Sequence, residues 1–145
     1  MKITILDKCP GEDDELVVKC NEVDESILKL INSLKQGKVR LNLYKDGKII
    51  RVEPQEIYYF ESVDTRVFAY GKTEVYETKS KLYELEKELP DCDFIRATKS
   101  TIINLNKIRS LSPALGGRFE ALLKNGEKQI ISRQYVASLK EKLGL

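Results

Sequence analysis

The sequence predicts a mainly β protein with some α structure, a β-rich α+β fold. From residue 38 onward, apolar and polar residues alternate with a period of two in one short run after another, and glycine or asparagine turns separate the runs. Only 24–36, 80–88 and 132–143 have the three- to four-residue apolar spacing of a helix. Of the 145 residues, 41% are hydrophobic and 33% are charged, which is the balance of a globular chain.

The first 37 residues are expected to form a short ββα segment. Runs 2–6 and 15–20 have strand patterns and are separated by Pro10-Gly11. Asp24 is a suitable N-cap for the helix over 24–36, and Gly37 is a suitable terminator. The apolar face of this segment needs a covering surface, so the segment is expected either to dimerise or to pack on its own domain.

Residues 38–145 are expected to form a second domain of small antiparallel sheets with short helices. A hairpin is predicted around Asp46-Gly47, which is a strong two-residue turn signal. Strands are predicted at 39–44, 48–52, 56–61, 66–70, 73–77, 94–97, 100–105, 108–112, 118–123 and 128–131. The helix over 80–88 is expected to be capped by Ser80 and ended by Pro90, and Ser132 is expected to cap the last helix.

Composition argues against several classes of chemistry. The chain has no histidine, the commonest general base and metal ligand, and its three cysteines have no CxxC spacing. We therefore expect no metal, no cofactor, no small-molecule substrate and no enzyme activity. The carboxylates Glu84 and Glu88 are better explained as a solvated helix face. No apolar run approaches the roughly 18 residues of a membrane span, and the N-terminus lacks a signal pattern, so a cytoplasmic protein is expected.

Charge is distributed unevenly along the chain. The net charge is only +2, but residues 94–145 carry 10 basic against 3 acidic side chains, whereas residues 53–93 carry 5 against 11. A basic third within a nearly neutral chain favours a localised face for a polyanion such as DNA. The alternative is that lysines which keep the protein in solution happen to cluster there.

Several motifs in fixed order connect the chain to a known family. They are the block Phe94-x-Arg96-x-x-x-Ser100-x-x-x-Asn104, the turn Asn125-Gly126 and the stretch Ser132-Arg133-x-Tyr135. Together they resemble the LytTR DNA-binding domain of bacterial transcription regulators, over about residues 38–145. The resemblance implies small stacked sheets whose loops read base edges in successive major grooves, at paired direct repeats in bent DNA. Most family members carry a receiver domain upstream, and 37 residues are too few for one, so a stand-alone member is expected.

The resemblance also assigns site residues. Three stretches match DNA-facing loops of the family: Asp64-Thr65-Arg66, Thr98-Lys99-Ser100 and Ser132-Arg133-Gln134-Tyr135. Base contacts are expected from Arg66, Lys99, Arg133 and Gln134, because these side chains suit guanine or adenine edges. Loop or backbone contacts are expected from Asp64, Thr65, Thr98, Ser100 and Ser132, and phosphate contacts from Arg96, Lys107 and Arg109.

Plainer interpretations stay open for each loop. Arg66 could be a solvated hairpin arginine, Lys99 could bind only a phosphate, and Ser132 could be a helix cap alone. Asn104 is assigned to structure, with its side chain holding a turn. The tyrosines at positions 58, 59, 70 and 76 are expected to be core or cross-strand residues.

The sequence thus predicts a cytoplasmic bacterial regulator that binds double-stranded DNA specifically, as a homodimer. The resemblance adds a small membrane protein as a possible regulatory partner. The alternative is a protein-interaction module or antagonist that acts through the N-terminal segment and does not bind DNA.

Overall fold

The computed structural model describes residues 2–35, 40–89 and 93–145. The chain divides into two compact units, Met1–Gly37 and Lys38–Leu145. In the first unit, helix α1 spans Glu25–Lys35 and begins as predicted, because the side chain of Asp24 accepts a 3.0 Å hydrogen bond from the amide of Ile27. The predicted terminator, Gly37, lies outside the described residues.

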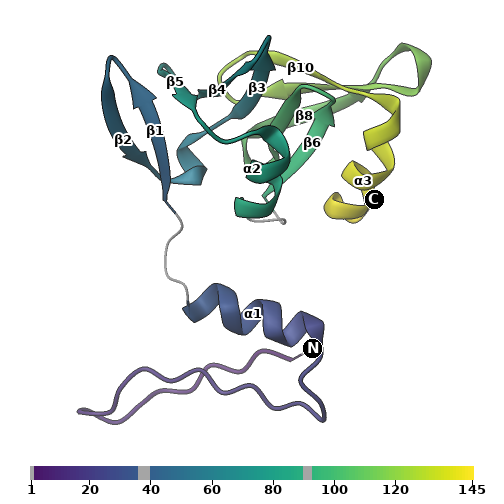
Figure 1. The fold of residues 1–145 in the computed structure, drawn as a ribbon. Helices are drawn as coiled ribbons and strands as arrows, with labels where there is room; N and C mark the ends of the chain where they lie inside the picture. The colour runs from purple at the N-terminus through teal and green to yellow at the C-terminus, as the bar shows by residue number, and fades with distance from the viewer. Residues whose placement is uncertain (1, 36–39, 90–92) are drawn as a thin grey trace. The chain divides into compact units, whose positions relative to one another are not determined.

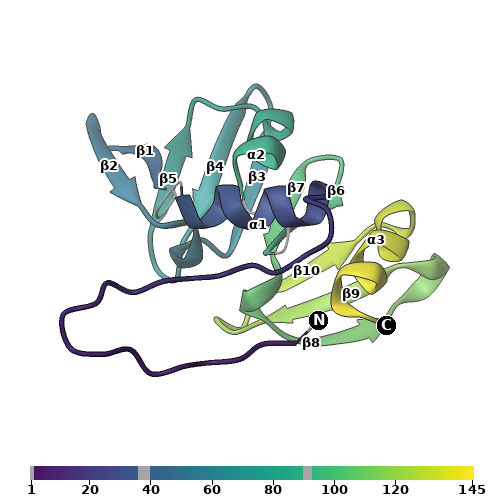
Figure 2. The same cartoon turned by 90° about the horizontal axis from the view of Figure 1, so that it is seen from below.

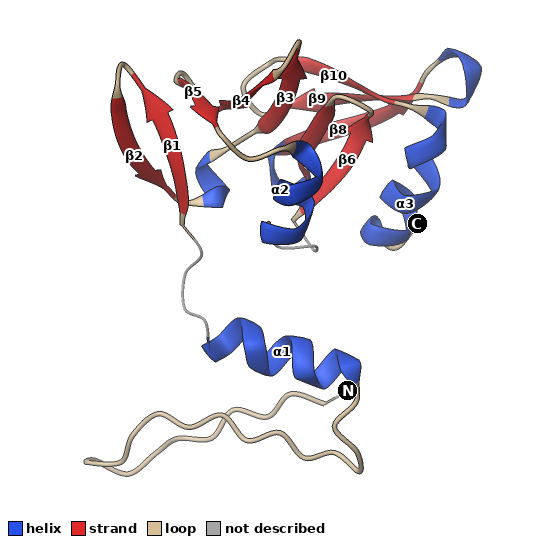
Figure 3. Ribbon diagram, in the orientation of Figure 1, coloured by secondary structure: helices blue, strands red, loops and turns tan. Residues whose placement is uncertain are grey.

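The two strands predicted before this helix are wrong. Residues 2–24 contain no strand, and Figure 3 shows them as loop up to α1. The side chains of Ile3 and Leu16, one from each run, are 84% and 68% exposed, so neither run is covered by an apolar surface. A strand is stabilised by burial and by ladder partners, and alternation alone supplies neither. What remains of the ββα prediction is the helix.

The second unit contains a seven-stranded antiparallel sheet and a three-stranded antiparallel sheet (Figure 1). The strand order in the first is β2-β1-β5-β4-β3-β7-β6, and in the second β10-β9-β8. The strands of the long sheet are β1 Leu41–Lys45, β2 Lys48–Val52, β3 Tyr59–Val63, β4 Arg66–Tyr70, β5 Val75–Thr78, β6 Phe94–Thr98 and β7 Thr101–Asn104. Those of the short sheet are β8 Ile108–Pro113, β9 Phe119–Leu123 and β10 Lys128–Ile131. The predicted β-rich α+β fold class is confirmed.

Among its described residues, 40–89 and 93–145, the second unit also has two α-helices and three 3-10 turns. They are α2 Leu82–Glu88, α3 Arg133–Leu143, η1 Pro54–Glu56, η2 Leu105–Lys107 and η3 Leu115–Gly117. Lys81, and not Ser80, occupies the N-cap position of α2, and its amide donates a 3.0 Å hydrogen bond to the carboxylate of Glu84. Ser80 lies one residue too early to cap this helix, and its amide donates a 3.1 Å hydrogen bond to the hydroxyl of Thr78.

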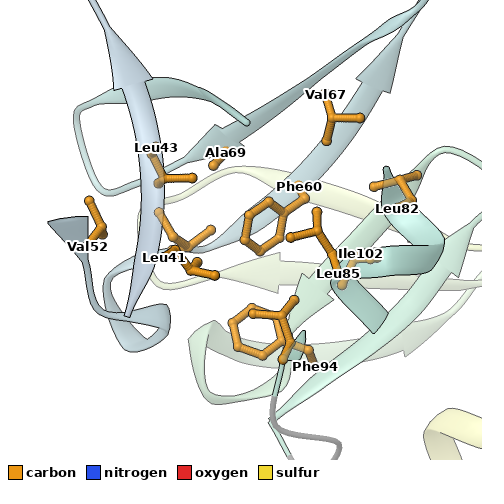
Figure 4. Packing of buried hydrophobic residues seen from close by; sticks show 12 residues of the cluster. Leu41, Leu43, Val52, Phe60, Val67, Ala69, Leu82, Leu85, Phe94 and Ile102 are labelled. Atoms are coloured by element: carbon orange, nitrogen blue, oxygen red, sulfur yellow. The ribbon is translucent and has the colours of Figure 1, made fainter. Parts of the chain in front are cut away.

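Strands β3, β7 and β6 each contribute apolar residues to two cores, one on either face of the long sheet, although each strand also carries polar residues such as Glu61, Arg96 and Thr101. On one face, Phe60, Phe94 and Ile102 pack with Leu85 of α2 in a first core. Figure 4 shows Phe60 between Leu41 and Leu43 of β1 on one side and Leu85 on the other. This core anchors α2 against the long sheet.

A second core lies between the long sheet and the short one. Ile95 and Ile103 point to this opposite face, where they pack with Leu123 of β9 and Leu139 of α3. The turned view in Figure 2 shows the three-stranded sheet and α3 gathered together, apart from α2. Successive residues of β6 and β7 therefore serve alternate cores, as the period of a strand requires.

Two structural predictions are confirmed in these cores. Tyr59 and Tyr70 are cross-strand partners whose rings stack at 4.4 Å. The buried side chain of Asn104 donates to the carbonyl of Ile57 at 2.8 Å and accepts from the amide of Asn106 at 2.9 Å, so it does hold the turn after β7.

Candidate nucleic-acid interface

The three predicted loops meet at one end of the second unit. The amide of Ser62, at the end of β3, donates a 2.8 Å hydrogen bond to the carbonyl of Ser100 in the β6–β7 turn. The amide of Ser132, between β10 and α3, donates one of 2.8 Å to the carbonyl of Ala97 at the end of β6. These two hydrogen bonds join stretches that lie between 35 and 38 residues apart in the sequence.

A fourth loop joins them that the sequence analysis missed. Ile131 pairs with Phe119, so the β8–β9 connection, which contains η3, lies beside the start of α3. It contributes Gly116 and Arg118 to an open groove of about 600 Å³. We call this the loop groove; its lining residues are Thr98, Lys99, Ser100, Gly116, Arg118, Ser132, Arg133 and Gln134. The Gly116-Gly117-Arg118 run inside the basic third was the available signal.

The loop groove is electropositive. Lys99, Arg118 and Arg133 are exposed, and none of them forms an ion pair with any residue of the described ranges. No carboxylate is among the described residues that line the groove. Three unneutralised cations around a polar groove attract a polyanion and present hydrogen-bond donors to it.

The Lys99 turn is held by its own backbone neighbours. The hydroxyl of Thr98 accepts a 3.1 Å hydrogen bond from the amide of Ser100, a local side-chain turn. The guanidinium of Arg96 donates to the carbonyl of Lys99 at 2.7 Å and also pairs with the carboxylate of Glu86. Arg96, which was expected to contact phosphate, is therefore engaged on two sides within the protein.

The aliphatic stem of Arg133 packs against Gly117. Gly117 has a left-handed backbone, with a φ of +75°, and a β-carbon placed on it would lie 3.0 Å from Cδ of Arg133. A side chain at position 117 would therefore displace the aliphatic stem of Arg133. Gly116 has nearly the same φ, +74°, but a β-carbon there would have no neighbour within 4 Å.

The start of α3 is partly as expected. Ser132 occupies the N-cap position with an extended backbone, and Arg133 and Gln134 are exposed in the first turn. The hydroxyl of Ser132, however, makes no capping hydrogen bond to the helix. Its side chain is thus available to a ligand in the groove.

The β3–β4 turn carries Asp64 and Thr65, both exposed, and leads into Arg66. The guanidinium of Arg66 is not directed to the groove, because it forms a double hydrogen bond with Glu77 on β5, at 2.8 and 2.6 Å. That arginine holds the pKa of the Glu77 carboxyl below its usual value by hydrogen bonding and charge.

The structure does not bring Lys107 and Arg109 to this end. Strand β7 starts at the loop groove and ends at Asn104, so η2 and the first residues of β8 lie at the opposite end of the sheets. There the ammonium of Lys107 lies 5.1 Å from the centre of the Tyr58 ring. These two cations, which were expected to contact phosphate, are therefore separated from the loop groove, because strand direction separates residues that lie close in sequence.

Other kinds of site find little support in the described ranges. No helix among residues 2–35, 40–89 and 93–145 is long and apolar enough to cross a membrane. In those same ranges, no three side chains of the histidine, cysteine, aspartate and glutamate types gather where a metal ion could bind.

Comparison with known proteins places the second unit in a described family. The family described as LytTr DNA-binding domain matches residues 47–144. A protein of Staphylococcus aureus described as an uncharacterized HTH-type transcriptional regulator is 32% identical over 127 residues, which cover 88% of this chain and 85% of that protein. The sensory transduction protein LytT of Enterococcus faecalis is 33% identical over 100 residues, which cover 69% of this chain and 41% of that protein.

A solved structure has the same architecture. The LytTr DNA-binding domain of a Bacillus cereus protein superposes with a TM-score of 0.71 at 28% identity, covering 75% of this chain and all of that domain.

Proposed function

Because this chain belongs to the LytTr DNA-binding domain family, we propose that it is a transcriptional regulator that binds duplex DNA through the loop groove. The observation that carries the proposal is the convergence of Lys99, Arg118 and Arg133 around a groove with no lining carboxylate among the described residues. A surface of this kind gains affinity from phosphates and still has long side chains left for base edges.

Roles within the groove follow from side-chain chemistry. Lys99 and Arg133 are donors suited to the O6 and N7 atoms of guanine, and Gln134 can pair with an adenine edge. Arg118, on the η3 loop, is assigned to a phosphate. Thr98, Ser100 and Ser132 supply hydroxyls to the sugar-phosphate backbone. Asp64 and Thr65 lie at the same end and are assigned to the rim of the contact.

Reading from loops agrees with the order of elements in this chain. Among the described elements, no two α-helices follow each other directly, since strands separate α1 from α2 and α2 from α3. The name of the Staphylococcus relative refers to a helix-turn-helix, but in this chain the cations lie on turns and at one helix start. We therefore assign recognition to the loops and not to an inserted helix.

We further propose that the chain acts as a homodimer on two adjacent direct-repeat sites. Support comes from α1, whose Ile27, Leu30, Ile31 and Leu34 recur at helical spacing and stay partly or largely exposed. Two linked copies would raise the affinity for paired sites through effective concentration. If the segment instead binds a different protein, the purified chain will be monomeric.

Two measurements test the DNA proposal. Selection from a random pool of duplexes should yield a preferred sequence, and its affinity should fall with salt on a slope that reflects on the order of 4–8 neutralised phosphates. A slope near zero between low and physiological salt would contradict DNA binding altogether. A steep slope without any selected sequence would leave a non-specific DNA binder.

A further inference from the structure

Arg96 connects the first core to the edge of the loop groove. It lies on β6 with a side chain that is only 20% exposed. Its Nε pairs with the carboxylate of Glu86 on α2, and its Nη1 donates a 2.7 Å hydrogen bond to the backbone carbonyl of Lys99. One guanidinium thus bridges a helix and a turn.

The helix end of this bridge is firmly held. Leu82 and Leu85 of α2 are buried in the first core, so the backbone that carries Glu86 cannot shift without disturbing Phe60 and Phe94. Through Arg96, the position of the Lys99 carbonyl is tied to that core. The turn has just two residues between β6 and β7, so fixing its carbonyl restricts the direction of the Lys99 side chain.

This geometry argues against a phosphate contact by Arg96. A guanidinium presents its donors in a planar fork; here Nε and Nη1 already serve a carboxylate and a carbonyl, and the side chain is only 20% exposed. The negative charge of Glu86 would also repel an approaching phosphate. A lysine could not replace the fork, because a single ammonium on a flexible stem cannot hold both partners in the same geometry.

We infer that Arg96, oriented by Glu86, is a positioning residue that fixes the turn from which Lys99 reads DNA. The inference rests on the proposed function for its consequence at DNA, but the positioning itself is a property of the free protein. This inference predicts that replacing the Arg96 guanidinium weakens sequence-specific DNA binding without removing a phosphate contact.

The test compares Arg96→Lys with Arg51→Lys, the same change at an exposed arginine on β2. Arg96→Lys should weaken binding to the selected duplex by roughly tenfold, the scale of one good base contact, with an unchanged salt slope. When Lys99→Ala is already present, adding Arg96→Lys should lower the affinity little further, since both changes remove the same base contact. Arg51→Lys should have no effect.

Glu86→Gln should change the affinity for DNA in opposite directions, depending on whether Arg96 positions the turn or contacts a phosphate. If Glu86 orients Arg96, the variant weakens binding to the selected duplex. If Arg96 instead contacts a phosphate, Glu86→Gln removes a neighbouring negative charge and strengthens DNA binding, and Arg96→Lys binds DNA as well as wild type does. Either result would overturn the inference.

A measurement without DNA separates this inference from the proposed function. Hydrogen exchange of the amides over residues 98–101 should be faster in Arg96→Lys than in wild type or in Arg51→Lys. Unchanged exchange would refute positioning whatever the chain binds. Faster exchange in a protein that fails to bind any duplex would instead refute the DNA proposal and leave positioning intact.

Discussion

Arg66 and Glu77 form a two-pronged ion pair between neighbouring strands β4 and β5, with Nε–Oε1 at 2.8 Å and Nη2–Oε2 at 2.6 Å. Both side chains are substantially exposed, at 61% and 35%, so the pair contributes little to folding. It matters because Arg66 lies at the loop end and has the side chain best suited to guanine. We therefore expect Glu77 to compete with DNA for that guanidinium.

Removing this competitor should strengthen DNA binding. In Glu77→Gln, the guanidinium of Arg66 loses its charged partner and a negative charge near the DNA disappears, so we expect a severalfold higher affinity for duplex. Competition binding measures the change. The matched control is Glu74→Gln, which removes an exposed carboxylate that pairs with Lys45 at the other end of β5. Weaker binding by Glu77→Gln would mean that Arg66 must be held by Glu77 to work.

The ion pair between Arg66 and Glu77 should make a small contribution to folding stability that depends on pH. The pKa of Glu77 is lowered from 4.5 by Arg66, so its contribution is present above that value and is lost as pH falls through the lowered pKa. We expect the Tm of wild type to exceed that of Glu77→Gln at neutral pH and the difference to vanish in acid. Calorimetry at several pH values measures it. A difference that persists once the Glu77 carboxyl is fully protonated would point to a cause other than the charge.

Lys99 should read a base, and a second exposed lysine, remote from the groove, controls for the loss of one positive charge from the protein. Lys99→Ala is expected to cost about 1–3 kcal/mol on the selected duplex and to relax discrimination at one or two positions. Lys124→Ala removes an exposed lysine after β9, at the end away from the groove. It should change neither quantity. If Lys99→Ala weakens all duplexes equally, then Lys99 contacts a phosphate.

The two glycines of η3 offer a control for backbone strain. Alanine at either position must adopt a left-handed backbone, which costs about 1–2 kcal/mol of stability. Only at Gly117 does the added methyl also meet the stem of Arg133. Denaturation should therefore find Gly117→Ala and Gly116→Ala similarly destabilised, while DNA titration finds weaker binding only in Gly117→Ala. Equal DNA affinities would mean that Arg133 adapts without loss.

The dimer proposal is tested on the full chain. Leu30 and Leu34 are 40% and 55% exposed on the apolar stripe of α1. Sedimentation should find a dimer for wild type and for Asn32→Ala, whose side chain lies off the stripe, and a monomer for the double change of both leucines to serine. A wild-type chain that stays monomeric at every concentration would refute the proposal.

Local features of the sequence were enough to predict most of the fold. The strands of the second unit, the hairpin at Asp46-Gly47 and the α1 cap at Asp24 depend on alternation, turn chemistry and capping, which involve only near neighbours in the chain. The family resemblance likewise rests on short motifs, and it assigned the loops at Lys99 and Arg133 that the fold then brought together in one groove. Their contacts with DNA stay a prediction.

Only the tertiary structure decided which charges are engaged and which are exposed to a partner. Glu77 and Glu86 hold Arg66 and Arg96 from strands and helices ten or eleven residues away, and Arg118 enters the groove through a strand order that local patterns do not encode. Runs 2–6 and 15–20 alternate like strands yet stay uncovered. The ion pairs, the position of Arg118 and the uncovered runs share one physical reason. Ion pairing and burial depend on which distant segments become neighbours, and that is set by packing of the whole sheet and not by periodicity within a run.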